Sequence, residues 1–105
     1  MIAEVTVRGT SQPNLNGRVA AAAVFDAKSK RYRLNGVTDT GAVLALKPEN
    51  VVLPRGTRVS IEGVSSRPEL NGLLGKIVDA DAERYTVQLP SGEQIRLKFG
   101  AVVAC

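Results

Sequence analysis

The sequence repeats itself with a period of about 51 to 55 residues. The string SQPNLNG begins at Ser11, and the similar string SRPELNG begins at Ser66. Matches continue on both sides of these strings and pair Val5 with Val59, Gly9 with Gly63, Asp26 with Asp81, Tyr32 with Tyr85, Leu46 with Leu97, and Val51 with Val102. A chain of 105 residues with this repeat is long enough for two very small domains. We therefore expect one domain at residues 1–54 and a second at residues 55–105.

The second copy has the pattern of a small all-β domain. Apolar and polar residues alternate at 57–63, 84–89 and 93–99. A further strand is expected at 75–81, and a short final strand is expected around 102–103. Pro90, Ser91 and Gly92 form a turn sequence before the alternation at 93–99. Five short strands with a long first loop are the order of an SH3-like barrel. The predicted fold is all-β, with two tandem SH3-like five-stranded barrels.

The connection between the copies is very short. Only Pro54, Arg55 and Gly56 lie between the last apolar residue of the first copy and Thr57, where the second copy begins. A connection of this length and composition does not act as a free tether. We therefore expect the two barrels to pack closely.

One stretch of the first copy, RVAAAAVFDAKSK at 18–30, leaves two structures open. Its alanines favour a helix by intrinsic propensity. The matching stretch of the second copy has the pattern of a strand, and an Asn-Gly turn precedes the alanines. These two observations favour a strand over residues 19–25.

The motif RPELNGLLGKIV at 67–78, together with LKPENVV at 46–52, resembles an SH3-like repeat of algal and protist multidomain proteins. The glycine-led opening is also similar to the KOW and Tudor branches of the same barrel class. The resemblance implies a non-enzymatic interaction module that binds a protein partner or organises an assembly. Arg67 and Glu69 lie in the motif and are candidate partner-binding residues, but the first copy has Gln12 and Asn14 at these positions.

The matched hairpins of the two copies carry opposite charge. The basic hairpin of the first copy contains Lys28, Lys30, Arg31 and Arg33, whereas the matching acidic hairpin contains Asp79, Asp81 and Glu83. Basic side chains on one hairpin can contact phosphates, which gives the alternative function of a KOW-like RNA- or DNA-binding module. The two hairpins can also pair with each other, which leaves self-association open. A charged, solvated surface without a partner is the third interpretation.

Other conspicuous residues are better explained by architecture. Asn16 and Asn71 each precede a glycine, as a tight turn requires. Tyr32 and Tyr85 alternate with apolar residues and are expected to face the core. Aromatic residues make up only 4% of the chain, too few for a methyl-lysine cage or a groove for proline-rich peptides.

The sequence offers little for catalysis or metal binding. It has no histidine, no G-x-S-x-G motif and no glycine-rich phosphate loop. The acidic hairpin lacks the glycine and the later glutamate of a calcium loop, and Cys105 is the one cysteine. We therefore expect no enzyme activity, cofactor or metal. With no signal-peptide pattern and no membrane-length apolar run, the expected location is intracellular, in the cytoplasm.

Overall fold

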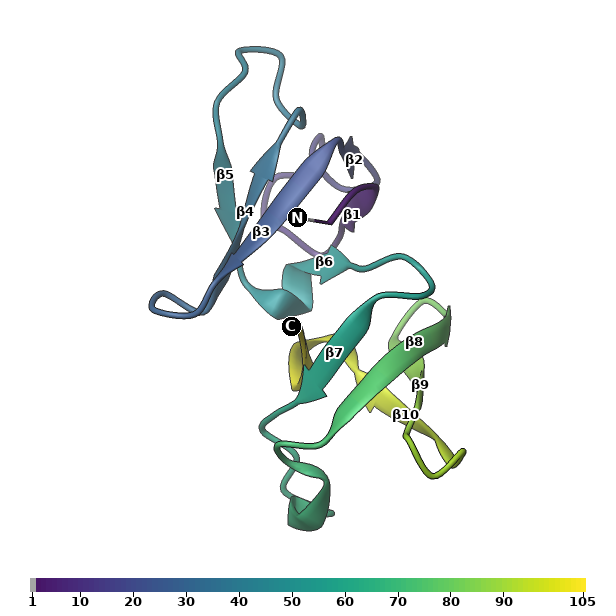
Figure 1. The fold of residues 1–105 in the computed structure, drawn as a ribbon. Helices are drawn as coiled ribbons and strands as arrows, with labels where there is room; N and C mark the ends of the chain where they lie inside the picture. The colour runs from purple at the N-terminus through teal and green to yellow at the C-terminus, as the bar shows by residue number, and fades with distance from the viewer. Residues whose placement is uncertain (1) are drawn as a thin grey trace. The chain divides into compact units, whose positions relative to one another are not determined.

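The computed structural model describes residues 2–105 (Figure 1). The described chain consists of short β-strands, three single-turn 3-10 helices and loops, and it contains no α-helix. It divides after Pro54 into two compact units, the first ending at that residue and the second spanning Arg55–Cys105. The expected all-β fold class is confirmed.

The first unit contains two antiparallel three-stranded sheets. One has the order β2-β1-β6 and consists of β2 (Val19–Ala20), β1 (Val5–Val7) and β6 (Val51–Val52). The other has the order β3-β4-β5 and consists of β3 (Ala22–Asp26), β4 (Arg31–Asn35) and β5 (Leu44–Leu46). The 3-10 helix η1 (Pro48–Asn50) precedes β6.

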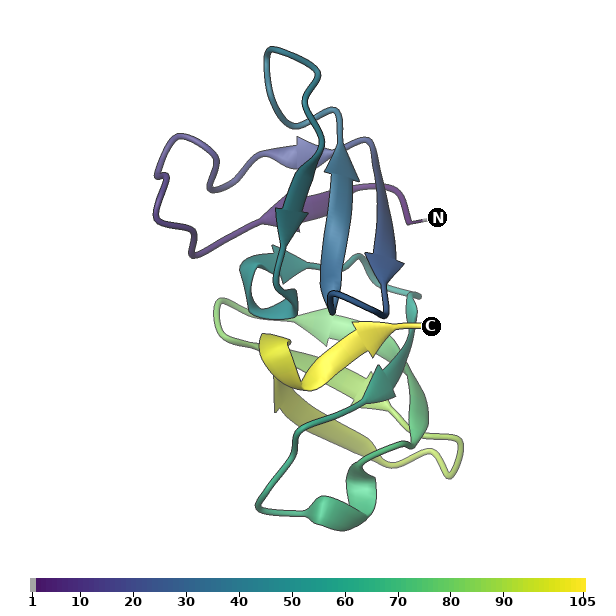
Figure 2. The ribbon, with the colours of Figure 1, turned by 90° about the vertical axis from the view of Figure 1, so that its left-hand side faces the viewer.

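The second unit contains one antiparallel sheet of five strands (Figure 2). Its order is β10-β9-β8-β7-β11, with β7 (Arg58–Ile61), β8 (Leu74–Ala80), β9 (Arg84–Gln88), β10 (Gln94–Lys98) and β11 (Val102–Ala104). The 3-10 helix η2 (Pro68–Leu70) lies in the long loop before β8, and η3 (Phe99–Ala101) joins β10 to β11. None of the three sheets closes into a barrel among the described residues.

The two units pair their strands in matching registers. Equivalent residues of the two sequence copies form equivalent cross-strand pairs. Val7 pairs with Val51 and Tyr32 with Leu46 in the first unit, and Ile61 pairs with Val102 and Tyr85 with Leu97 in the second. If β2 and β3 are taken as one interrupted strand, both units have the same strand order. The repeat in the sequence therefore corresponds to a repeat in strand pairing.

The long strand after the first loop is irregular in both units, but at different points. In the first unit it is interrupted at Ala21, whose amide donates a hydrogen bond to the Asn35 carbonyl oxygen at 3.0 Å. In the second unit β8 is continuous, and its register with β9 shifts between Ile77 and Asp79, which is a β-bulge. The strand expected at 19–25 is thus confirmed against the helix, with an interruption that the sequence pattern did not predict.

The core consists largely of small aliphatic side chains around one tyrosine in each unit. Tyr32 and Tyr85 are almost fully buried, as their alternation with apolar residues predicted. Tyr85 contacts Phe99 edge to face at a ring-centroid distance of 4.6 Å, and Tyr32 lies 4.9 Å from Phe25. The tyrosine rings therefore fill the core and are not available for stacking on a ligand.

Candidate interaction surfaces

The turn of the basic hairpin is closed by Asp26 at the end of β3. Its carboxylate accepts a hydrogen bond from the Lys28 amide at 2.9 Å and forms an ion pair with Arg33 at 3.1 Å. The Lys28 amide is the main reason that the pKa of Asp26 lies below its ordinary value. Arg33 is therefore engaged within the hairpin.

The other three predicted basic residues have no such partner. Lys28, Lys30 and Arg31 form no ion pair within the described chain, and both lysines are exposed. Lys30 has a φ of 56°, so that the chain reverses direction at this residue. The hairpin offers three cations, rather than the predicted four, to an external ligand.

In the acidic hairpin, two of the three carboxylates are occupied. Asp81 accepts hydrogen bonds from the Glu83 and Arg84 amides, each at 2.8 Å, and forms an ion pair with Arg96. Asp79 forms an ion pair with Arg55 at 2.9 Å. These interactions leave Glu83 as the one acidic side chain of the hairpin without an ion pair among residues 2–105, so the acidic hairpin has little charge left for pairing with the basic one.

Both aspartates have a lowered pKa for the same kind of reason. The Glu83 amide is the largest influence on the pKa of Asp81, and the Ala80 amide, followed by Arg55, is the largest on that of Asp79. Asp81 closes its turn as Asp26 closes the other. The match between Asp26 and Asp81 in the sequence was the signal that could have revealed this structural role.

Arg67 and Glu69 lie close together on the loop before β8. They form an ion pair at 3.2 Å, and Arg67 also contacts Glu93 in the β9–β10 turn at 3.6 Å. The pKa of Glu69 is lowered first by its own backbone amide and then by Arg67. The predicted pair therefore exists, and it links the long loop to the next hairpin.

The two asparagines of the Asn-Gly turns hold their loops closed. The Asn71 side chain accepts a hydrogen bond from the Val64 amide at 2.8 Å and donates one to the Val64 carbonyl oxygen at 2.9 Å. Asn16 makes the corresponding contacts with Thr10, accepting from its amide at 2.9 Å and donating to its carbonyl oxygen at 3.3 Å. Their expected architectural role is confirmed.

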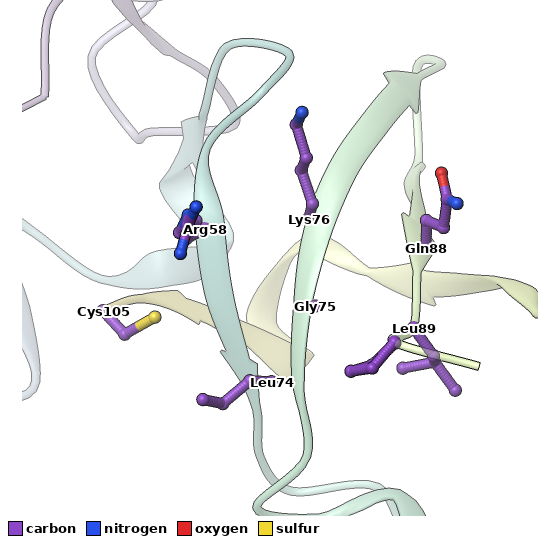
Figure 3. A pocket seen from close by; sticks show the side chains of 8 residues that line it. Arg58, Leu74, Gly75, Lys76, Gln88, Leu89 and Cys105 are labelled. Carbon is purple, nitrogen blue, oxygen red and sulfur yellow. The ribbon is translucent and has the colours of Figure 1, made fainter. Parts of the chain in front are cut away.

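Sequence reasoning did not identify a groove on the outer side of β7, β8 and β9 (Figure 3). The exposed side chain of Leu74 lies in it, and Arg58 and Lys76 are direct cross-strand partners at its rim. The groove has a volume of about 530 Å³, and its lining residues are Arg58, Leu74, Gly75, Lys76, Gln88, Leu89, Pro90 and Cys105. Neither Arg58 nor Lys76 forms an ion pair within residues 2–105.

The outer face of β3, β4 and β5 in the first unit is more apolar. Val24 and Val43 are about half exposed there, next to Arg33, Asn35 and Ala45. Asp79 occupies the register position in the second unit that corresponds to Val24. The two units therefore present different chemistry on equivalent strands.

Comparison of the sequence with protein-family models and with the curated proteins gave no match. Within residues 2–105, no helix has the length and apolar character needed to cross a membrane. Nor does any group of three histidine, cysteine or acidic residues in that part of the chain have the arrangement of a metal site.

Proposed function

We propose that the chain is a non-enzymatic interaction module that binds a protein partner or organises an assembly. The observation that supports this most is the groove in Figure 3, where an exposed leucine lies beside two cations that have no ion pair within the described residues. Leu74 is 58% exposed, and an apolar side chain in a polar rim suits the centre of a protein interface. A segment with one apolar residue flanked by carboxylates would complement the groove.

We further infer that each unit is an SH3-like barrel. The shared strand order and the 3-10 helix before the last strand in both units support this inference. The close packing of the two barrels, which the connection at 54–56 predicts, stays a prediction. So does the cytoplasmic location, which agrees with a single free cysteine.

The double substitution Leu74→Asp and Lys76→Glu tests the proposed groove. Both residues are exposed, so the variant should fold, and it should capture less of the parent's protein partner from a native extract treated with nuclease. The control variant Lys28→Glu and Lys30→Glu carries a comparable charge change on the first unit and should capture the partner normally. Equal capture by the parent and both variants would exclude the groove as the partner site.

A second candidate function is binding of RNA or DNA through the basic hairpin. It is favoured by the three cations, Lys28, Lys30 and Arg31, that form no ion pair among the described residues. Three phosphate contacts predict a slope of about −2 to −3 in a plot of log affinity against log salt concentration. Binding of a mixed RNA and DNA pool at two salt concentrations, with the Lys28→Glu and Lys30→Glu variant as comparison, distinguishes this function from protein binding.

A further inference from the structure

The strand β10 lies at the edge of the five-stranded sheet and pairs only with β9 (Figure 1). The Leu89 amide donates to the Glu93 carbonyl oxygen at 2.8 Å, and the antiparallel pattern then alternates along the strand. Ile95 and Leu97 therefore direct their backbone groups toward β9. Gln94, Arg96 and Lys98 direct theirs away from it, and no backbone hydrogen bond from another part of residues 2–105 reaches them.

A groove runs along this free edge, between β10 and the long loop that follows β7. It consists of two adjoining hollows of about 390 Å³ and 290 Å³. Both hollows are lined by Val64 and Ser66 from the loop and by Arg96 and Leu97 from β10. Asn71 fixes the position of Val64, so the loop forms a wall that stands apart from the strand edge.

The groove is positively charged at the end of β10. Arg84 and Lys98 both line the hollow at this end and are direct cross-strand partners, and neither forms an ion pair within the described chain. Like charges in this position destabilise a sheet unless an anion lies between them. Arg96 is paired with Asp81 and Arg67 with Glu69 and Glu93, so Arg84 and Lys98 are the cations left for a ligand.

We propose that an extended acidic peptide binds in this groove as an additional strand on the free edge of β10. A peptide backbone offers donors and acceptors in alternation, which matches the unpaired groups of Gln94, Arg96 and Lys98. Phosphate groups only accept hydrogen bonds, so phosphate contacts alone would leave the carbonyl oxygens of this edge unpaired. The proposal rests on the proposed protein-binding function, but its surface differs from the groove in Figure 3.

The test uses a synthetic hexapeptide in which glutamate and valine alternate. On an added strand, alternate side chains share a face, so that the glutamates can lie on the side of Lys98 and its cross-strand partner Arg84 while the valines face Val64. Binding is measured by fluorescence anisotropy, and hydrogen exchange is followed at the amides of Gln94, Arg96 and Lys98. We expect saturable binding that slows exchange at these three amides.

Two N-methylated peptides provide the matched control for the backbone contacts. Methylation of the alternate amides that face β10 should weaken binding about tenfold, since two net hydrogen bonds are lost. Methylation of the other set should have little effect on affinity. Equal affinities of the two peptides, or no binding at millimolar peptide, would overturn the proposal.

Protein variants then separate this site from the other surfaces. Arg84→Glu with Lys98→Glu should abolish peptide binding, whereas Lys28→Glu with Lys30→Glu should retain it. Leu74→Asp with Lys76→Glu should also retain it, even though that variant loses the partner of the Figure 3 groove. If the Arg84 and Lys98 variant still binds the peptide normally, or loses binding of an RNA and DNA pool instead, the groove does not recognise acidic peptides.

Discussion

At the scale of single residues, Gly75 shows how closely two strands approach each other in the second unit. A Cβ atom at this position would lie 2.6 Å from Cγ1 of Val87 and 3.0 Å from the carbonyl oxygen of Gln88. The Val87 side chain is fully buried and stiff at χ1, and the carbonyl oxygen belongs to the paired strand β9 and cannot move independently. Gly75→Ala should therefore lower the free energy of unfolding of the second unit by about 1–3 kcal/mol.

Urea unfolding followed by NMR signals of each unit measures this effect. The natural comparison is Ala20, which pairs with Val5 as Gly75 pairs with Val59 and is fully buried. The first unit has a methyl group at this position, and its strand is interrupted one residue later, at Ala21. A Gly75→Ala protein as stable as the parent would mean that β8 can shift away from β9.

Asn71 provides a second prediction for a single residue. Its side chain makes both hydrogen bonds that close the loop to Val64, and Asn71→Ala removes them. We expect a loss of about 1 kcal/mol in the stability of the second unit, because both contacts are exposed to water. Faster hydrogen exchange at the Val64 amide would accompany it. Unchanged exchange at Val64 would show that the loop does not depend on this side chain.

At the scale of elements, the basic hairpin contains residues with two different roles. Lys28, Lys30 and Arg31 have no ion pair among the described residues, whereas Arg33 pairs with Asp26. Substitution of these three cations by glutamate reverses their charge and should change the free energy of unfolding by no more than about 0.5 kcal/mol. Arg33→Glu alone should lower the melting temperature more, since it places a second carboxylate beside Asp26. If the triple variant is the less stable of the two, the three cations have a structural role.

The strands were predictable because alternation and turn residues are local signals. In 84–89 and 93–99 each apolar residue faces the core, and the strand pairing follows the repeat. The interruption at Ala21 and the bulge after Ile77 were not predictable, because each depends on how the strand pairs with its neighbour in the folded sheet.

The grooves beside Leu74 and Arg96 were also not predicted from the sequence. Polar residues at alternate positions indicate only a solvent-facing side, and the neighbouring loop that forms a groove comes from tertiary structure.

At the scale of the whole molecule, one strand order supports two different surfaces. Val24, Ala45 and Val43 make the outer face of β3, β4 and β5 apolar. Asp79 and Arg96 occupy the positions equivalent to Val24 and Ala45 in the second unit and carry charge. The buried positions, by contrast, are similar in both units. Divergence between these two sheets is therefore concentrated on the outer faces.

The carboxylates that stabilise the two units are also unequally distributed. Within residues 2–105, a lowered pKa is found for Asp26 in the first unit and for Glu69, Asp79 and Asp81 in the second. A carboxyl whose pKa is lower in the folded state contributes stability above its unfolded pKa. That contribution is lost as the pH falls through the lowered folded value. Acidification from about pH 4 downward should therefore destabilise the second unit more than the first.

NMR spectra recorded from pH 6 to pH 2 test this difference, because amide signals report on each unit separately. We expect the signals of residues 55–105 to lose dispersion at a higher pH than those of residues 2–54. Glu69→Gln and Asp79→Asn remove two of the three groups, so the double variant should be less stable at neutral pH and less sensitive to acid. Asp81, the third of these groups, is still present in the double variant and closes the hairpin turn through two amides. The stability of the second unit should therefore still fall slightly on acidification. Loss of the first unit at the higher pH would mean that Asp26, Glu69, Asp79 and Asp81 do not control the order of acid unfolding.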